Sequence, residues 1–434
     1  MNLISSKSRH ISGELFCPGD KSISQRILII GSILNADIEI NGFLDAHDPN
    51  STLNALNDIG SSIEKIDKKI IITKRKVPFC DPSKNLDLGN SGTGVRLMLG
   101  LISGLGINAR FVGDSSLMKR PMRRVIDPLM EMGAKNFSDN GTLPIDSIRS
   151  KIRNDFSYKM PIASAQVKSC LLLAALSSKT NISLQEPKIT RDHTERMIEY
   201  FGGNIEYGTD KKIVYEYSEL SSRSSYQIVG DFSSASFIIA ASLISENSKV
   251  LLKNVGLNTT RSALLDLLKR MGAKIEVINK QTTCNELIGD LIIQSSKLQG
   301  INVPEDIIPN IIDEIPILSI IAAFADGQTI IKNASELKVK ESDRLFAISD
   351  GLNKLKINHE TYDDGLLIFG GNQSIDCDDW IDSFDDHRIA MSFLIAGLKS
   401  KNGIKVKNCK NIDTSFPDFR NIMNKLGMKL SEKN

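Results

Sequence analysis

The chain has 434 residues, of which 41% are hydrophobic and 24% are charged, and its formal net charge is +2 at pH 7. These proportions are typical of a soluble globular protein, and the near-neutral charge without a basic block excludes a dedicated nucleic-acid binder. A chain of this length exceeds one ordinary hydrophobic core, so we expect two domains of roughly 200 residues each.

The N-terminus and the cysteines indicate a cytoplasmic protein. The first ten residues, MNLISSKSRH, lack the apolar run of a signal peptide. The most apolar long stretch, IIPNIIDEIPILSIIAAFA, contains Asp313 and Glu314, and we do not expect it to span a membrane. The six cysteines form no C-x-x-C pair, so neither a zinc site nor a disulfide framework is predicted, which fits a reducing compartment.

Six segments share one plan, in which a polar cluster opens a run of apolar and small residues typical of a buried helix. In chain order they are KSISQRILIIGSIL from residue 21, NSGTGVRLMLGLIS from 90, SAQVKSCLLLAALSS from 164, DFSSASFIIAASLIS from 231, DEIPILSIIAAFADG from 313 and DDHRIAMSFLIAGLKS from 385. Their starts lie 69, 74, 67, 82 and 72 residues apart, which indicates an internal repeat. Any single cluster is explained by ordinary helix N-caps.

A second, amphipathic helix recurs with the same period, ends near a glycine and leads into a strand. Its copies are LNALNDIGSSIEKI, LMEMGAKNF, MIEYFGGNIEY, LLDLLKRMGAKIEVI and IMNKLGMKL, and LNKLKINHETY occupies the fifth position without its glycine. Glycine after the last turn is expected to adopt the left-handed conformation. Each repeat of about 70 residues therefore reads as strand, helix, strand, helix, strand, and we expect two domains of three repeats each.

The polar clusters predict a binding region for an anionic ligand. Helix N-termini attract anions through free backbone N–H groups and the helix dipole, and symmetric repeats would bring six such ends to one region. The stretch VKESDRL at residues 339 to 345 is less clear by itself. It is compatible with a solvated first helical turn, with Lys340 and Arg344 one turn apart on one face.

Ten motifs in this chain resemble those of a known family. They are PGDKSISQR, LGNSGTGVRL, KRPM, ASAQVKS, TRDHTE, GDFSSASF, IDEIP, VKESDRL, DDHRIAM and TSFPDF, in the order found in 5-enolpyruvylshikimate-3-phosphate synthases, also called 3-phosphoshikimate 1-carboxyvinyltransferases. The resemblance spans about residues 10 to 425. It implies a two-domain inside-out α/β barrel, the enolpyruvyl transferase fold, in which each domain has three βαβαββ repeats. One domain would span residues 20–229 and the other would combine residues 1–19 and 230–434, with a cleft that closes on substrate.

The activity that the resemblance implies is an enolpyruvyl (carboxyvinyl) transfer. Phosphoenolpyruvate would give this group to the 5-hydroxyl of shikimate 3-phosphate and release phosphate, in the shikimate pathway to chorismate and aromatic amino acids. The partners would be these small molecules, with no metal or organic cofactor, no nucleic acid and no membrane, and the protein would be a monomer. Such chemistry needs cations for phosphates and carboxylates, a base for the hydroxyl and an acid for the methylene carbon.

The resemblance also assigns roles to residues. Lys21, Asp313 and Glu341 would be catalytic, with Lys21 bridging both substrates, Asp313 acting as base and Glu341 exchanging a proton with the methylene carbon. Shikimate 3-phosphate would be bound by Lys21, Ser22, Arg26, Ser164, Ala165, Gln166, Arg191, Asp313 and Lys340. Phosphoenolpyruvate would be bound by Lys21, Asn90, Gly92, Thr93, Arg120, Gln166, Arg344, His387 and Arg388. The charged VKESDRL stretch would then hold the acid/base Glu341 on the opening turn of a helix, three residues before Arg344.

Five matching residues keep a structural interpretation beside the functional one. Arg96 and Arg124 could each form a structural pair on its own helix. His387 could have the purely structural role of orienting Asp386 and capping a helix. Lys168 lies one turn beyond Ser164 and could face substrate or solvent. His193 is expected to pack or to support the binding residues.

Two positions depart from the family pattern, and one characteristic glycine is kept. Thr414 stands where one branch of the family has a ligand-binding lysine, and Gln25 stands where the other branch often has histidine. Gly92 is kept and leaves room against phosphoenolpyruvate, so glyphosate, an analogue of it, is expected to inhibit.

Two alternatives are weighed against this reading. UDP-N-acetylglucosamine enolpyruvyl transferase shares the fold and the donor substrate, but its usual reactive cysteine is absent from FVGDSSLMKRPMRR. An inactive anion-binding homologue would be expected to lose Asp313 or Glu341, and both are present.

Overall fold

The structure is a computed structural model that describes residues 1–8 and 10–433. It divides into two compact units. Unit 1 comprises Met1–Pro18, Gly230–Gln281 and Leu287–Asn434, and unit 2 comprises Gly19–Val229 and Thr282–Glu286.

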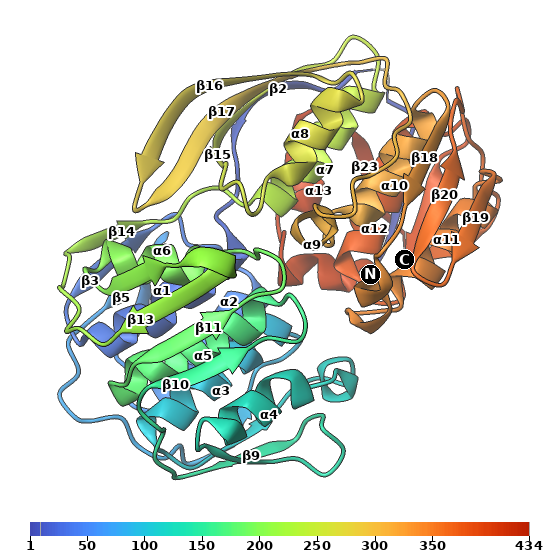
Figure 1. Ribbon diagram of the computed structural model, residues 1–434. Coiled ribbons are helices and arrows are strands. Elements are labelled where there is room, and N and C mark those ends of the chain that lie inside the picture. The colour runs from blue at the N-terminus through green and yellow to red at the C-terminus, as the bar shows by residue number, and fades with distance from the viewer. Residues whose placement is uncertain (9, 434) are drawn as a thin grey trace. The chain divides into compact units, whose positions relative to one another are not determined.

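The described residues of unit 2 form three four-stranded sheets with one topology (Figure 1). The strand orders are β14 (Ser225–Gln227), β3 (Ile38–Asn41), β5 (Lys69–Ile72) and β4 (Ile63–Ile66); β6 (Leu86–Asp87), β7 (Ala109–Val112), β9 (Ile145–Ile148) and β8 (Lys135–Phe137); and β10 (Phe156–Lys159), β11 (Ile182–Gln185), β13 (Lys212–Glu216) and β12 (Asn204–Tyr207). In each sheet the first two strands are parallel and the other neighbours are antiparallel, as where Ala109 lies opposite Ser147.

Helices of two kinds complete unit 2. The longer ones, which start at or just after the first three predicted polar clusters, are α1 (Lys21–Leu34), α3 (Gly92–Leu105) and α5 (Ala165–Ser178). Shorter ones contact the sheets at β4, β8 and β12 and are α2 (His47–Asp58), α4 (Arg123–Glu131) and α6 (His193–Tyr200). Close packing of α3 on α5 requires Gly100, because a Cβ there would lie 2.2 Å from the carbonyl oxygen of Cys170.

Unit 1 repeats this plan. Its sheets have the orders β16 (Lys274–Thr283), β17 (Glu286–Gln294), β15 (Lys249–Gly256) and β2 (Ser12–Phe16); β21 (Trp380–Asp382), β22 (Ile404–Lys407), β1 (Asn2–Ser6) and β23 (Lys429–Lys433); and β18 (Gln328–Ile331), β20 (Gly365–Phe369) and β19 (His359–Tyr362). At the edge of the last sheet, isolated parallel bridges join Asn302 to Ile330 and Gln299 to Asp326, in the place of a fourth strand. The helices at the buried positions are α7 (Phe232–Ile244), α10 (Ile315–Phe324) and α12 (His387–Ala396), and the remaining ones are α8 (Ala263–Arg270), α9 (Ile308–Ile311), α11 (Arg344–Lys354) and α13 (Phe419–Lys425).

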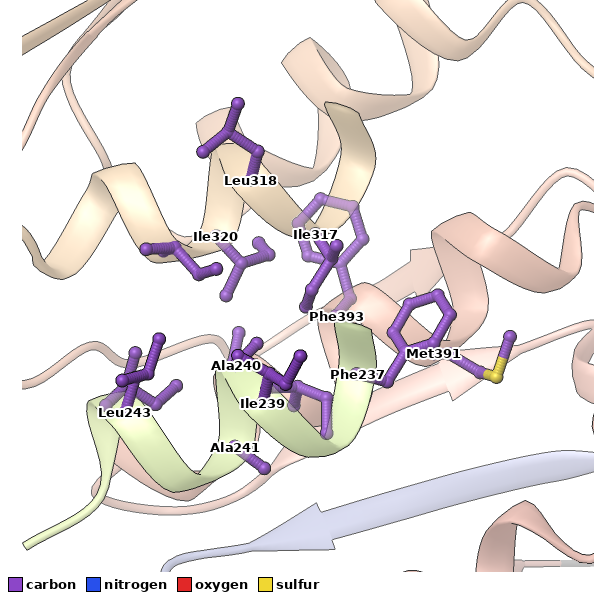
Figure 2. Close-up of a cluster of buried hydrophobic side chains, with 14 of the residues drawn as sticks. Phe237, Ile239, Ala240, Ala241, Leu243, Ile317, Leu318, Ile320, Met391 and Phe393 are labelled. Atoms are coloured by element: carbon purple, nitrogen blue, oxygen red, sulfur yellow. The ribbon is translucent and has the colours of Figure 1, made fainter. Parts of the chain in front are cut away.

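The core of unit 1 lies where α7, α10 and α12 meet, and Figure 2 shows their side chains facing one another. All 13 residues of α7 and all ten of α12 are buried. A helix that is apolar on every side can lie only in the interior, which explains why the helices are inside and the sheets outside. Among the described residues no helix combines the length and the apolar character needed to cross a membrane.

The observed repeat is βαβαββ, as in β6, α3, β7, α4, β8 and β9. The fold implied by the resemblance is therefore confirmed. The five-element reading of the residue pattern was wrong by one strand, because β8 (KNF) and β9 (IDSI) have only three and four residues and show no long alternation.

The short helices end as the pattern predicts. The five glycines that follow them have positive φ: Gly60 98°, Gly133 108°, Gly202 82°, Gly272 95° and Gly427 107°. In the fifth repeat Lys356 takes the left-handed conformation, with φ 57°, so the turn is retained without glycine. The side chain adds a steric cost there that glycine avoids.

One segment does not follow the expected domain limits. Residues 282–286 were expected to lie with residues 230–434, but this tip of the β16–β17 hairpin packs with unit 2. Polar contacts fix it there: Glu286 Oε1 lies 2.7 Å from His193 Nδ1, and Arg196 Nη1 donates to the carbonyl oxygen of Asn285 over 3.0 Å. A sequence pattern shows that a hairpin forms, but it does not show what the hairpin tip contacts.

Candidate functional site

The polar clusters cap the long helices, as predicted. The side chains of Asp20, Ser91, Ser164, Asp231 and Asp386 accept hydrogen bonds from backbone N–H groups in the first turns of α1, α3, α5, α7 and α12. At α10 the capping position is held by Glu314, whose side chain makes no cap hydrogen bond. That carboxylate binds arginine side chains instead.

In unit 2 the N-termini of α1, α3 and α5 are joined in a ring by side-chain hydrogen bonds. Gln25 Nε2 on α1 donates to Ser91 Oγ before α3 over 2.6 Å, and Arg96 Nη1 on α3 donates to Gln166 Oε1 on α5 over 2.6 Å. Arg26 Nη2 on α1 donates to Ser169 Oγ on α5 over 2.9 Å. Three helix N-termini therefore converge. Such ends favour an anion through their backbone N–H groups and dipoles.

Lys21, the first residue of α1, lies at this junction. Its Nζ is 3.0 Å from Asp48 Oδ2 on α2, and their side chains are 13% and 7% exposed. Gln25, one turn later, is fully buried and donates to the carbonyl oxygen of Asp48 over 3.3 Å. Gln25 thus links the first turn of α1 to α2, the contact that sequence reasoning could not place.

Arg26 is a buried cation behind this junction. Its Nε donates to Thr194 Oγ1 over 2.8 Å and its Nη1 to the carbonyl oxygen of Ser22 over 3.0 Å. Burial lowers the pKa of Arg26 to about 10, although Glu195 acts in the opposite direction. Arg26 therefore keeps its charge at neutral pH and holds the backbone of Ser22 in place.

Arg120 lies beside the start of α3. Its Nη2 donates to Asn90 Oδ1 over 2.7 Å, and Asn90 Nδ2 donates to Asp114 Oδ2 over 2.7 Å. A Cβ on Gly92 would lie 2.8 Å from Arg120 Nη1, so only glycine leaves this guanidinium where it is. The structure thus groups three of the predicted phosphoenolpyruvate residues.

Gln166 and Thr93 form a neighbouring pair. Gln166 Nε2 donates to Thr93 Oγ1 over 3.0 Å, while Gln166 Oε1 accepts from Arg96. Arg96 is buried and also donates to the carbonyl oxygens of Gly92 and Pro121, at 3.3 and 3.1 Å. These contacts favour the structural interpretation of Arg96. Arg124 and Arg191 are partly buried.

Lys168 is directed to neither of the two surroundings that its spacing suggested. Its side chain is 1% exposed, and its Nζ lies 2.7 Å from Glu195 Oε1 and 2.9 Å from Glu186 Oε2. Burial by itself lowers the pKa of Lys168, but these two carboxylates outweigh burial and raise it. His193 is also buried, and its partner is Glu286, so both residues support the fold around Arg26.

In unit 1 the N-termini of α7, α10 and α12 converge in the same manner. Ser233 Oγ donates to Glu314 Oε1 over 2.5 Å, which links α7 to α10. Arg388 Nη1 on α12 donates to Ser233 Oγ over 2.9 Å and to the carbonyl oxygen of Asp313 over 3.1 Å. His387, beside Arg388, is buried at the start of α12.

Arg344 is the centre of a cluster of carboxylates. It is fully buried, and its guanidinium donates to Asp386 Oδ2 over 2.8 Å, to Asp313 Oδ1 over 3.3 Å and to Glu341 Oε2 over 2.5 Å. Burial lowers the pKa of Arg344, but Asp386, Glu341 and Asp313 more than offset this and raise it. Lys340 Nζ is 3.5 Å from Asp313 Oδ1 and Arg388 Nη2 is 4.0 Å from Asp313 Oδ2, so with Arg344 three cations surround that aspartate.

The VKESDRL stretch differs from the expected helical turn. The helix α11 begins at Arg344, and Asp343 caps it by accepting from Phe346 N over 3.1 Å. Lys340 and Glu341 therefore precede the helix. An aspartate in a favourable capping position starts the helix later than the charge spacing suggested.

The candidate residues thus form two sets, one in each unit. The unit 2 set contains Lys21, Ser22, Arg26, Asn90, Gly92, Thr93, Arg120, Ser164, Ala165, Gln166 and Arg191. The unit 1 set contains Asp313, Lys340, Glu341, Arg344, His387 and Arg388. Within the described part of the chain, no group of three or more histidine, cysteine, aspartate or glutamate side chains is placed to hold a metal ion.

Comparison with known proteins agrees with this arrangement. The family described as EPSP synthase (3-phosphoshikimate 1-carboxyvinyltransferase) matches residues 5–423. The chain belongs to the EPSP synthase family. A 3-phosphoshikimate 1-carboxyvinyltransferase from Petrotoga mobilis is 46% identical over 423 residues, which are 96% of this chain and 98% of the relative. One from Legionella pneumophila is 42% identical over 434 residues, which are 100% and 99% of the two chains.

The fold of solved EPSP synthase structures matches this chain over its whole length. The EPSP synthase of Acinetobacter baumannii is 37% identical, has a TM-score of 0.85 and covers all of both chains. An enolpyruvyl transferase from Streptomyces tendae shares the fold, with a TM-score of 0.80 at 16% identity over 100% of this chain and 98% of that one. The relatives favour EPSP synthase over the UDP-N-acetylglucosamine alternative.

Sequence reasoning missed Arg261. This buried arginine lies two residues before α8, as Arg191 lies two residues before α6. The repeat could have revealed it, because other repeats also have an arginine near the start of their second helix. Arg120 precedes α4 in the second repeat, and Arg344 is the first residue of α11 in the fifth. A comparison of the repeats at this position would have found it.

Proposed function

We propose that this member of the EPSP synthase family transfers the enolpyruvyl group of phosphoenolpyruvate to the 5-hydroxyl of shikimate 3-phosphate and releases phosphate. The observation that carries the proposal is the Arg344 cluster. There, Asp313 and Glu341 are held by one buried guanidinium, at 3.3 and 2.5 Å. The cluster holds two carboxylates and a cation together, and in this proposal they would serve as the base, the acid and the charge-stabilising group of the reaction.

The unit 2 set supplies the cations for the acceptor in this proposal. Lys21 and Arg191 would bind its charged groups, and Arg26 would hold Ser22 in place. Ser164 and Gln166 at the start of α5 would bind the acceptor beside the donor. Guanidinium groups bind phosphate and carboxylate through two parallel hydrogen bonds, so arginine suits these positions.

The chemistry would follow from the unit 1 set. Asp313 would take the proton of the 5-hydroxyl while the hydroxyl oxygen forms a bond to the central carbon of phosphoenolpyruvate. At the same time Glu341 would give a proton to the methylene carbon. The bond to phosphate would then break as the resulting methyl group returns its proton to Glu341, and the proton held by Asp313 would pass to the departing phosphate or to solvent. Arg120, Arg344 and Arg388 would stabilise the charge of the donor.

The same cluster explains how binding could start the reaction. An ion pair stabilises a carboxylate in its charged form, so Glu341 must leave Arg344 before it can donate a proton. Phosphoenolpyruvate is itself an anion that can replace Glu341 on the guanidinium. Donor binding would therefore free the Glu341 carboxylate, which would take up a proton from solvent before it acts as the acid.

A phosphate-release assay tests the proposal. We expect phosphate when both phosphoenolpyruvate and shikimate 3-phosphate are supplied, and none when either is left out. The control replaces shikimate 3-phosphate with UDP-N-acetylglucosamine. Release with the nucleotide sugar, or binding of both substrates without release, would contradict the proposed reaction.

We also propose that the protein acts in the cytoplasm as a monomer on these small molecules, with inhibition by glyphosate. The absence of any C-x-x-C pair among the six cysteines of the sequence supports a reducing compartment. The oligomeric state is checked by light scattering at micromolar concentration, where a mass of about 48 kDa is expected for the 47.8 kDa chain.

A further inference from the structure

Glu314 is a buried carboxylate shared by two arginines. Its side chain is fully buried next to the candidate base Asp313. Arg261 Nη1 donates to both of its oxygens, each over 2.9 Å, while Arg388 Nη1 donates to one of them over 3.4 Å. Arg261 therefore makes the shorter contacts and Arg388 the longer one.

Ser233 connects the same three side chains. Its hydroxyl donates to Glu314 Oε1 and accepts from Arg388 Nη1 and from Arg261 Nη2. One donated and two accepted hydrogen bonds are all that a serine hydroxyl can make. Asp231, which caps α7, lies 3.8 Å from Arg261 Nη2 and adds a weaker carboxylate contact.

The charges set up a competition for Arg388. A buried carboxylate needs a cation, because an unpaired charge in the interior is strongly destabilising. If Arg261 did not neutralise Glu314, this carboxylate would attract the guanidinium of Arg388. Arg388 would then turn toward Glu314 and away from an external anion.

We infer that Arg261 is a positioning residue: it neutralises Glu314 and so keeps Arg388 directed to the donor phosphoenolpyruvate. This inference rests on the proposed function, because it uses the role of Arg388 as a donor-binding residue. Arg261 acts through Glu314 and Arg388 and has no contact with the reacting atoms in this account. Its loss should therefore affect the donor more than the acceptor.

The test compares Arg261→Met, Glu314→Gln and the double variant with the wild-type enzyme. Methionine keeps much of the arginine volume without the charge, and glutamine keeps the shape of Glu314 without its charge. We expect Arg261→Met to raise the KM for phosphoenolpyruvate at least tenfold and the KM for shikimate 3-phosphate less than threefold. The double variant should restore the donor KM to within about threefold of wild type, because no unpaired carboxylate then competes for Arg388.

Rescue separates positioning from a purely structural role. If Arg261 only supported the fold, Arg261→Met would lower the melting temperature and leave the KM values for both substrates close to those of the wild-type enzyme. Equal increases in both KM values, or a double variant with a donor KM as high as that of Arg261→Met, would overturn the inference. Where Arg261→Met alone does not fold, Arg261→Lys and the double variant decide it: lysine keeps a cation beside Glu314 and the double variant removes both charges, so we expect a donor KM within about threefold of wild type in each, and a tenfold donor-selective rise in either would overturn the inference.

Failure of this inference is distinct from failure of the proposed function. Wild-type enzyme that releases no phosphate contradicts the function. Active wild type with an Arg261→Met variant of unchanged donor KM contradicts the inference alone.

Discussion

Arg344 shows how one buried side chain can organise a site. A cation that is fully buried requires carboxylate partners, and Asp386 accepts from Arg344 Nε over 2.8 Å and from Nη2 over 3.4 Å, while Nη1 donates to Asp313 and Nη2 also to Glu341. Asp386 also caps α12 through the backbone N–H of Arg388. The same aspartate therefore fixes both a helix start and the arginine at the centre of the cluster.

Glu341→Gln tests the candidate acid. Glutamine can still accept a hydrogen bond from Arg344 Nη2 but carries no ionisable proton, so we expect turnover to fall roughly 100-fold or more with substrate binding nearly unchanged. Steady-state rates and phosphoenolpyruvate titrations measure both quantities. The exposed Glu360→Gln is the control, and near-wild-type turnover of Glu341→Gln would remove Glu341 from the mechanism.

Gly92→Ala tests the donor side of unit 2. The new methyl group would meet Arg120 Nη1 at 2.8 Å and Arg96 Nη1 at 3.2 Å, and these side-chain ends can shift while the fold is kept. We expect the KM for phosphoenolpyruvate to rise by roughly tenfold, about 1.4 kcal/mol, with the acceptor KM little changed. Gly208→Ala is the matched control, because a Cβ there finds only ordinary contacts, the nearest at 3.5 Å. A donor KM equal to wild type would argue against a role of Arg120 in donor binding.

At the scale of elements, the turn after α11 departs from its five counterparts. Lys356 adopts φ 57° where they have glycine. Lys356→Gly should therefore stabilise the protein by about 0.5–1 kcal/mol, because it removes the steric cost of a side chain in the left-handed region. Urea unfolding measures the change, and Asn353→Gly inside α11 should instead destabilise by a few tenths of a kcal/mol. A loss of stability in both variants would contradict the role assigned to the turn.

The tip of the β16–β17 hairpin should give a pH-dependent contribution to stability. Burial lowers the pKa of His193, but the carboxylate of Glu286 outweighs burial and raises it, with smaller effects from Asp20 and Arg26. Because the folded state then binds the proton more tightly than the unfolded chain, the stabilisation is complete below about pH 6.5 and is lost as the pH rises through the folded-state pKa.

The measurement compares the free energy of unfolding of wild type and His193→Gln. We expect a larger deficit for the variant at pH 6 than at pH 9. The exposed His10→Gln is the control for loss of a titrating histidine in general. A deficit that is constant with pH would show that the pair contributes only packing.

At the scale of the whole molecule, the candidate residues are divided between two units. Lys21, Arg26 and Arg120 belong to unit 2, whereas Glu341 and Arg344 belong to unit 1. If both sets bind the same substrates, bound anions should offset the repulsion between the cations of the two sets. We expect the radius of gyration from X-ray scattering to decrease when shikimate 3-phosphate is added. An unchanged radius with saturating ligand would count against closure.

The sequence by itself determined most of the fold and the identity of the candidate residues. Six strongly apolar helices were expected in the interior, and the polar residues before them were expected to cap them, as Ser91 and Asp231 do, whereas Glu314 before α10 does not. Glycine at the end of the amphipathic helices specified the turns, and the ten motifs specified the family. These features are local, because a helix, a cap or a turn depends on residues a few positions apart.

The tertiary structure alone decided the partners of the charged groups. Lys21 pairs with Asp48, 27 residues away, and Arg261 with Glu314, 53 residues away. It also decided that Lys168 is buried, and that the hairpin tip with Glu286 joins unit 2. A charge has no preferred sequence separation from its partner, so ion pairs follow from packing of the apolar helices, and only the folded chain specifies them.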